Sequence, residues 1–302
     1  MSIRQITIIG TGLIGGSFAL ALRKRKFAGR IVGCDRESAL AKAKECGAIE
    51  QGFYEPADAV RGSQLVVLAT PVLGIIDLIG RLGPSLAPTI LMTDVGSTKA
   101  AIAQQAANVF GESAKHRFLA GHPMAGKENS GVEFADADLF QGAVWFLTPL
   151  AEQNLHDEAF AEFLGWIDQI GARVAALSPE KHDRLCGWVS QVPQMISTAL
   201  AAALVEEFGE DSPLLAAGGR ALREMTRIAA SPYSMWRDIA ISNKNNLEDA
   251  LLKVEQRLAH IRENLTTKQL AEEFEVAHLL KKSVGKESTT TTPQRHRGTE
   301  KT

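Results

Sequence analysis

The chain has 302 residues, of which 45% are hydrophobic and 23% are charged, and its formal net charge is −2. This composition is typical of a soluble globular protein and excludes a disordered or fibrous chain, while the length predicts two domains. A near-neutral balance gives no general reason to bind nucleic acid or an acidic membrane. Cys34, Cys46 and Cys186 are spaced too widely for a disulfide framework or a zinc site, which favours a reducing cytoplasm.

Two further features bear on location. The first predicted strand begins within a few residues of Met1, so we expect no signal peptide. The longest apolar stretch, residues 185–205, contains several polar side chains and a proline, which favours a buried helix of a soluble bundle over a membrane span. We therefore expect a cytoplasmic protein.

Short apolar runs alternate with helical patterns through the first half of the chain. The predicted strands are 6–9, 31–34, 65–69 and 90–93, the predicted helices are 13–25, 40–46 and 75–82, and two further strands are expected at 118–120 and 144–147. Strands without alternation that are separated by helices predict a parallel sheet covered on both faces. The fold class is therefore α/β, with an N-terminal Rossmann-type doubly wound parallel sheet.

The second half of the chain is mostly helical in period. Between residues 155 and 280 only 174–176 is a strand candidate, and the apolar spacing over 247–265 predicts a long amphipathic helix. We expect an NAD-binding Rossmann domain at 1–150, an all-helical substrate and dimerisation domain at 151–282, and a disordered tail at 283–302.

A glycine-rich turn gives the strongest local signal. Gly10, Gly12 and Gly15 follow the first strand at once and open the first helix. Such glycines allow a tight turn, a close approach of the backbone to a pyrophosphate, and close packing of helix on strand. Leu13 and Ile14 lie at the helix start, where free N–H groups bind phosphates. We expect all five residues to contact a dinucleotide.

An acidic residue supports this prediction and favours one cofactor. Asp35 ends the second strand, 20 residues after Gly15. A carboxylate at this place accepts the hydroxyls of the adenosine ribose and repels a 2′-phosphate, so NAD is favoured over NADP. Arg36 leaves NADP open, because an arginine beside the acid can receive that phosphate.

Two later turns are expected at the same edge of the sheet, because ligands bind outside the carboxyl ends of parallel strands. Thr70 and Pro71 follow one strand, and Asp94 and Ser97 belong to the turn after the next. We expect Thr70, Pro71 and Asp94 to border the cofactor. Ser97 has a second interpretation, as the N-cap of a helix over residues 98–109.

His122 is the candidate for proton transfer. It lies in a stretch rich in glycine and proline, residues 121–131, which predicts a shaped loop after a strand. Oxidation of a carbinol carbon by hydride transfer needs a group that takes the hydroxyl proton. A neutral histidine does this near neutral pH and contributes roughly 10²–10⁴ in rate.

At this point the sequence resembles a known family, the prephenate/arogenate dehydrogenases of tyrosine biosynthesis. The motifs that carry the resemblance are 10–15, 94–99, 121–131, 178–183, 190–194, 225–229 and 236–239. The resemblance covers the chain to about residue 265. The histidine loop combined with the Arg227 motif is far more specific than the glycine turn, which many dehydrogenases share.

The resemblance implies roles for individual residues. His122 corresponds to the catalytic histidine, Ser97 to a catalytic serine that orients the substrate hydroxyl, and Arg227 to an arginine that binds a substrate carboxylate. The other residues expected at the substrate site are Ser190, Gln194, Glu128 and His182. The resemblance also implies a homodimer, with prephenate or arogenate as the small-molecule substrate. Neither a metal site nor a nucleic-acid or membrane partner is expected.

The implied reaction is the oxidative decarboxylation of prephenate to 4-hydroxyphenylpyruvate with NAD. Many family members that use prephenate carry histidines where Gln191 and Gln194 stand here. The neutral amides leave arogenate, which would give tyrosine directly, as an alternative. Two further alternatives are a β-hydroxyacid-type dehydrogenase with a proton-transferring lysine, Lys181 or Lys244, and a non-catalytic NAD-binding regulator.

Overall fold

The structure is a computed structural model that describes residues 2–210, 213 and 215–284. The chain separates into two compact units, one ending at Glu248 and the other beginning at Asp249. The predicted disordered tail, residues 283–302, lies outside the described residues apart from its first two, which complete helix α13 (Lys268–Val284).

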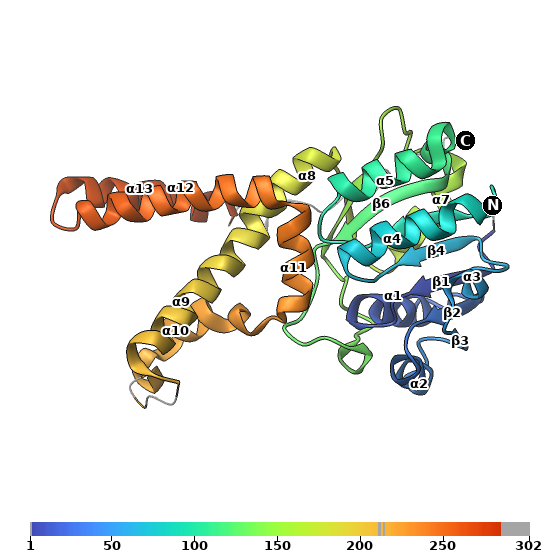
Figure 1. The fold of residues 1–302 in the computed structure, drawn as a ribbon, viewed down its shortest axis with the longest axis horizontal. Helices are drawn as coiled ribbons and strands as arrows, with labels where there is room; N and C mark the ends of the chain where they lie inside the picture. Colours follow the sequence, from blue (N-terminus) through green and yellow to red (C-terminus); the bar gives the residue numbers. More distant parts are fainter. Residues whose placement is uncertain (1, 211–212, 214, 285–302) are drawn as a thin grey trace, which may run out of the picture. The chain divides into compact units, whose positions relative to one another are not determined.

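An eight-stranded sheet lies at the centre of the first unit, between two layers of helices (Figure 1). The strands are β1 (Gln5–Ile9), β2 (Arg30–Cys34), β3 (Gln51–Phe53), β4 (Leu65–Leu68), β5 (Leu91–Asp94), β6 (Phe118–Pro123), β7 (Val144–Thr148) and β8 (Arg173–Ala176). Their order is β3-β2-β1-β4-β5-β6-β7-β8. Neighbouring strands are parallel except for β6 and β7. The predicted doubly wound sheet is therefore confirmed, with one antiparallel step where no crossover helix joins the strands.

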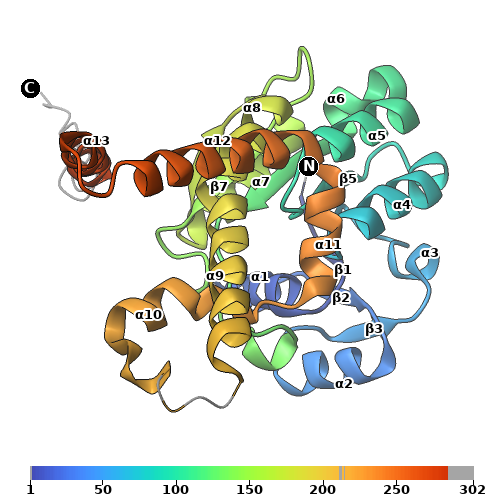
Figure 2. The same cartoon turned by 60° about the vertical axis from the view of Figure 1, so that its left-hand side comes forward.

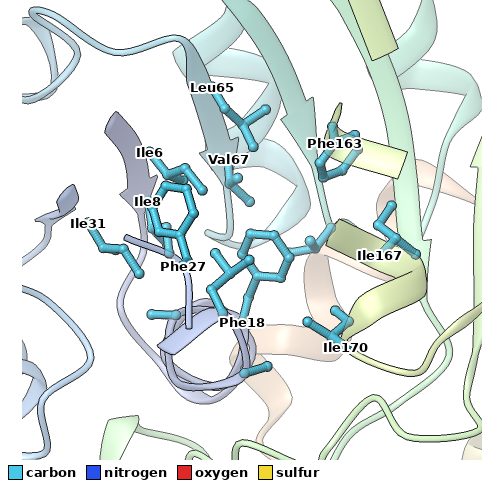
Figure 3. Close-up of a cluster of buried hydrophobic side chains, with 14 of the residues drawn as sticks. Ile6, Ile8, Phe18, Phe27, Ile31, Leu65, Val67, Phe163, Ile167 and Ile170 are labelled. Atoms are coloured by element: carbon cyan, nitrogen blue, oxygen red, sulfur yellow. The ribbon is translucent and has the colours of Figure 1, made fainter. Parts of the chain in front are cut away.

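Helices cover both faces of this sheet, and each face has its own hydrophobic core. One core contains residues of α1 (Leu13–Lys24), α2 (Glu37–Glu45) and α7 (Glu158–Gln169) packed on alternate strand residues such as Ile6, Ile8 and Leu65 (Figure 3). The helices of the other face are α3 (Pro56–Ala59), α4 (Val72–Leu82), α5 (Ala100–Phe110) and α6 (Ala114–Arg117). Burial on both faces explains why the strands read as continuous apolar runs.

The first unit contains further helices after the sheet. They are α8 (Pro179–Cys186), α9 (Val192–Phe208), α10 (Gly219–Thr226), α11 (Tyr233–Ser242) and the start of α12 (Lys244–Glu263). A π-helical turn, Gly187–Gln191, joins α8 to α9. Helix α11 packs against α4 (Figure 2), where the buried Asp238 accepts a hydrogen bond from Leu73 N at 3.3 Å. This contact fixes α11 against the sheet layer.

In the second unit, the remainder of α12 and α13 form a helical pair. Arg257 of α12 donates a hydrogen bond to Glu273 of α13 at 2.7 Å. Several large apolar side chains of this unit are exposed, including Leu258, Leu265 and Phe274. The predicted long amphipathic helix over 247–265 corresponds to most of α12.

Three local features differ from the expectations. Strand β3 was not predicted, because its three residues are too few for a pattern. His122 lies in strand β6, opposite Phe146 of β7, rather than in a loop after the strand. Strand β8 pairs with β7, so the sheet continues to Ala176, and a division at residue 150 would separate β7 from α7 and β8.

The turn between β1 and α1 depends on glycine at two positions. Gly10 has a φ of +98°, and a Cβ there would lie 2.5 Å from the carbonyl oxygen of Ala69. A Cβ on Gly15 would lie 2.0 Å from the carbonyl oxygen of Gly10. A Cβ on Gly12, in contrast, would meet nothing within 4 Å. The turn is therefore closed on the strand side and open on the other side.

This asymmetry gives a test of stability. Gly15→Ala should lower the free energy of unfolding by about 1–3 kcal/mol, because the added methyl group forces backbone atoms apart. Gly12→Ala is the matched control and should change it by about 0.5 kcal/mol or less, because Gly12 is the N-cap of α1 in an extended conformation and an added methyl group meets open space. Urea unfolding followed by circular dichroism measures both. Equal stability of the two variants would contradict the packing described here.

Candidate active site

One cavity joins the glycine turn to His122. Its volume is about 550 Å³, which is within the range of small-molecule sites. The carboxyl ends of β1, β4, β5 and β6 border it on the sheet side, and the π-turn and α11 border it on the other side. Among the predicted site residues, the cavity is lined by Gly12, Leu13, Ile14, Thr70, Pro71, Ser97, His122, Glu128 and Ser190.

The glycine-turn end of the cavity has free hydrogen-bond donors. Helix α1 begins after Gly12, which has no side chain that could cap the helix. The N–H groups of the first helical turn are therefore not bound by an N-cap side chain. Asp35 lies beside this turn, because its carboxylate accepts hydrogen bonds from Thr11 N at 2.7 Å and from Arg36 N at 2.7 Å. Gly10 and Gly15 do not line the cavity and act by shaping the turn.

A chain of hydrogen bonds fixes the imidazole of His122. Asp183 accepts a hydrogen bond from His182 Nδ1 at 2.8 Å, so the proton of His182 is on Nδ1. The bare His182 Nε2 then accepts from His122 Nδ1 at 2.9 Å. This assignment leaves His122 Nε2 as a lone pair, and it has no hydrogen-bond partner within the described part of the chain.

Asp183 itself is held by the start of α5. Its two carboxylate oxygens accept hydrogen bonds from Lys99 N at 2.6 Å and Ala100 N at 2.8 Å. These are N–H groups that a helix N-cap would otherwise satisfy. The interpretation of Ser97 as the N-cap is therefore wrong: α5 begins at Ala100 and receives its capping from a side chain of α8. Ser97 instead lines the cavity.

The surroundings of His122 favour its neutral form. Burial lowers the pKa of His122 well below its ordinary value of 6.5, and the Lys99 ammonium lowers it further. The ring is therefore unprotonated at neutral pH. A neutral imidazole with a bare Nε2 is the form that a general base requires.

A buried ion pair lies beneath the cavity. Lys99 and Asp94 are both fully buried, and the Lys99 ammonium contacts the Asp94 carboxylate and donates to the Gly121 carbonyl oxygen at 2.8 Å. Burial raises the pKa of Asp94 and lowers that of Lys99, while the attraction between the two charges opposes both shifts. Asp94 also accepts hydrogen bonds from Gly96 N and Gly121 N. Its burial places it under the cavity floor, where it fixes two loops, rather than on the wall.

Arg227 lies at the rim in an ion pair. Its guanidinium contacts the carboxylate of Glu128, which lines the cavity, whereas Arg227 itself does not. Gln194 is buried and donates to the carbonyl oxygen of Ile228 at 2.9 Å, so it supports the segment that carries Arg227. His182 is likewise buried and reaches the cavity only through His122.

Two sequence profiles match this chain. One is described as "Prephenate dehydrogenase, nucleotide-binding domain" and matches residues 18–176, and the other as "Prephenate dehydrogenase, dimerization domain" and matches residues 178–281. The chain belongs to the prephenate dehydrogenase family. The resemblance predicted from the motifs is therefore confirmed.

Similar proteins agree with this assignment. Prephenate dehydrogenase of Bacillus subtilis is 36% identical over 253 residues, which are 81% of this chain and 65% of that protein, just under two thirds of its length. The crystal structure of A. aeolicus prephenate dehydrogenase in complex with hydroxyphenyl propionate and NAD+ has a TM-score of 0.82 at 31% identity, over 96% of this chain and 99% of that one. The arogenate dehydrogenase of Synechocystis has a TM-score of 0.71 at 27% identity, over 94% and 99%.

Several residues of this prephenate dehydrogenase family site were not singled out from the sequence. They are Lys99, Asp183, Cys186 and Trp236, whereas Gln191 was noted from the sequence only for the histidine that many family members carry at its position. Lys99 and Asp183 are the last residues of two motifs that carry the family resemblance. Their places in the motifs could be read from the sequence, but the residues to which they hydrogen-bond could not. Gln191 and Trp236 line the cavity, and each has a buried N–H group without a partner among the described residues.

The ion pair beneath the cavity gives a second test of stability. Lys99→Met should lower the free energy of unfolding by about 3–5 kcal/mol, because it leaves the Asp94 carboxylate buried without a counter-charge. Arg81→Met is the control: it breaks an ion pair with Asp77 whose side chains are 58% and 60% exposed, and should cost less than about 1 kcal/mol.

Urea unfolding of both variants measures the difference. The double variant Asp94→Asn with Lys99→Met should recover part of the loss, because it removes the unpaired charge and keeps an acceptor for Gly96 N. A cost for Lys99→Met as small as that for Arg81→Met would contradict the assigned role of the buried pair.

Proposed function

We propose that the protein catalyses the NAD+-dependent oxidative decarboxylation of prephenate to 4-hydroxyphenylpyruvate. The observation that carries this proposal is one cavity lined both by the glycine turn and by His122, a neutral histidine whose Nε2 is left as the acceptor because Nδ1 donates to His182. The relatives named prephenate dehydrogenase supply the substrate class. The fold supplies the geometry.

The glycine turn fits a dinucleotide. Gly12 lines the cavity with open space where a Cβ would stand, so a pyrophosphate can approach the backbone and the free N–H groups of α1. The Asp35 carboxylate is placed to accept ribose hydroxyls and to repel a 2′-phosphate, which favours NAD over NADP. Arg36 donates its backbone N–H to the Asp35 carboxylate at 2.7 Å, and its exposed side chain keeps NADP as the less favoured alternative. When bound, NAD+ supplies the hydride acceptor.

His122 manages the proton of the reaction. Prephenate has a ring carbon that carries a hydroxyl group, and oxidation of that carbon releases the hydroxyl proton. His122 Nε2 accepts this proton, and the resulting positive charge is stabilised through His182 by the Asp183 carboxylate. Loss of the ring carboxylate as CO₂ then makes the ring aromatic, which drives the reaction forward. The steps assigned here to residues of the chain use no metal ion.

The remaining wall residues bind and orient the substrate. Ser97 and Ser190 line the cavity, and Ser97 lies in the chain between Asp94 and Lys99, the buried pair that fixes its loop. The guanidinium of Arg227 is a planar cation at the rim of the cavity, paired with Glu128. A substrate carboxylate can take the place of Glu128 as its partner.

Arogenate is a second candidate substrate. Glu128 lines the cavity with a carboxylate, which attracts the ammonium group that arogenate carries in place of the keto group of prephenate. The structural likeness to an arogenate dehydrogenase supports the same possibility. A β-hydroxyacid-type reaction is not favoured, because neither Lys181 nor Lys244 lines the cavity.

The protein is proposed to act as a homodimer in the cytoplasm. The second profile describes a dimerization domain, and it covers helices with exposed apolar side chains such as Val205, Phe208 and Leu258. The helical segment 179–208 is also long and apolar enough to cross a membrane, judged by length and composition alone. Only 22% of its most apolar 18-residue stretch is buried. A second copy of the chain covers such a face in a soluble dimer.

A spectrophotometric assay tests the proposal. Purified protein receives prephenate or arogenate with NAD+ or NADP+, and reduced nicotinamide and CO₂ are followed. We expect turnover with prephenate and NAD+. His122→Asn should lower kcat by roughly 10²–10⁴-fold, because the base is lost, while the Kd for NAD+ changes little.

His116→Asn is the matched control, since His116 is an exposed histidine paired with Asp157 outside the cavity. Its kcat should equal that of the unmodified protein. Tight NAD+ binding without turnover of either acid would support the non-catalytic regulator instead. Turnover that His122→Asn leaves unchanged would refute the assigned base.

A further inference from the structure

Three potential metal ligands meet at the edge of the cavity, which two of them line. His122 Nδ1, His182 Nε2 and Cys186 Sγ lie within 4.8 Å of one another. The separations are 2.9 Å between the two nitrogens, 3.3 Å from the sulfur to His182, and 3.9 Å from the sulfur to His122. A tetrahedral zinc ion holds such atoms roughly 3.3–3.6 Å apart. Shifts of a few tenths of an ångström would therefore complete three of four ligand positions.

The surroundings resemble those of a built metal site. A histidine that binds a metal usually donates its other ring N–H to a carboxylate, and His182 donates to Asp183 in this way at 2.8 Å. The ring of Phe146 packs edge-on against His182, with centroids 5.4 Å apart, and fixes its plane. His182 is thus held in the orientation that coordination through Nε2 requires.

An ion has a route to these atoms and an open fourth position. His122 and Cys186 both line the cavity, so a hydrated ion can enter from it and keep a water molecule on that side. The Asp183 and Asp94 carboxylates lie close by and offset the opposing charge of the Lys99 ammonium. Burial raises the pKa of the Cys186 thiol to about 12, so the thiol is protonated until an ion displaces its proton.

We propose that His122, His182 and Cys186 form an inhibitory site for a divalent metal ion that accepts nitrogen and sulfur ligands, of which Zn²⁺ is the type. On binding, the S–H bond breaks, the sulfur–metal bond forms and the proton leaves to solvent. The metal also occupies His122 Nδ1, so the ring proton moves to Nε2. The nitrogen that accepts the substrate proton is then blocked, and the reaction stops.

The inhibitory effect rests on the proposed function, whereas the binding does not. The full-length protein is assayed with prephenate and NAD+ while ZnCl₂ or MgCl₂ is added in a non-chelating buffer. Zn²⁺ should inhibit and a chelator should restore the rate. Mg²⁺ should have no effect at the same concentration, because it prefers oxygen ligands.

Variants of two cysteines locate the effect. Cys186→Ser removes the sulfur with little change of size, and should raise the Zn²⁺ concentration for half-inhibition at least tenfold when each protein is compared with its own uninhibited rate. Cys46→Ser changes an exposed cysteine at the end of α2 and should leave that concentration unchanged. Equal sensitivity of the two variants would overturn the assignment.

A measurement without catalysis separates this inference from the function. Co²⁺ is added to the same proteins, and the thiolate-to-Co²⁺ charge-transfer absorption is recorded. The band should form in the unmodified protein and in Cys46→Ser, and be absent from Cys186→Ser. Its absence from all three would overturn the site. A band in a protein that turns over neither acid would refute the proposed function and leave the metal site standing.

Discussion

The hydrogen bond from His122 Nδ1 to His182 Nε2 is the interaction on which the rest of the site depends. It joins the last residues of β6 to α8, and so joins the sheet to the helical part of the first unit. It also decides the tautomer of His122, because His182 Nδ1 is already committed to Asp183. Without this bond, the proton of His122 would not be fixed on Nδ1, and Nε2 would not be left as the acceptor.

The hydrogen bond is effective because each neighbouring group is fixed by burial. Asp183 is held by the first N–H groups of α5, and the Lys99 side chain beneath them neutralises Asp94 and holds the Gly121 carbonyl. Residues that contact no ligand therefore determine the position of the one that does. A buried ion pair adds little net stability compared with apolar packing, so we attribute its presence here to the placement of two loops.

Much of this arrangement could be predicted from the sequence, since apolar runs mark the buried strands and glycines mark the turn between β1 and α1. Gly12, Ser97, His122 and Ser190 were expected at one site, and the structure brings them to one cavity. The predictions that were wrong concern contacts between residues that lie far apart in the chain. The cap of α5 comes from Asp183, 83 residues after Ala100, and no local pattern around Ser97 indicates it. The reversal of β7 likewise follows from the loop before it, whose path the sequence does not specify.

The central claim is that His122 is neutral at physiological pH, with its proton on Nδ1. Nitrogen NMR of the histidine side chains tests it most directly, with His122→Asn used to assign the signals. Because burial lowers the pKa of His122, its ring should stay neutral as the pH falls through 6.5, with the ¹⁵N shifts of the Nδ1-protonated tautomer. A ring that titrates at or above 6.5, or that carries its proton on Nε2, would contradict the account.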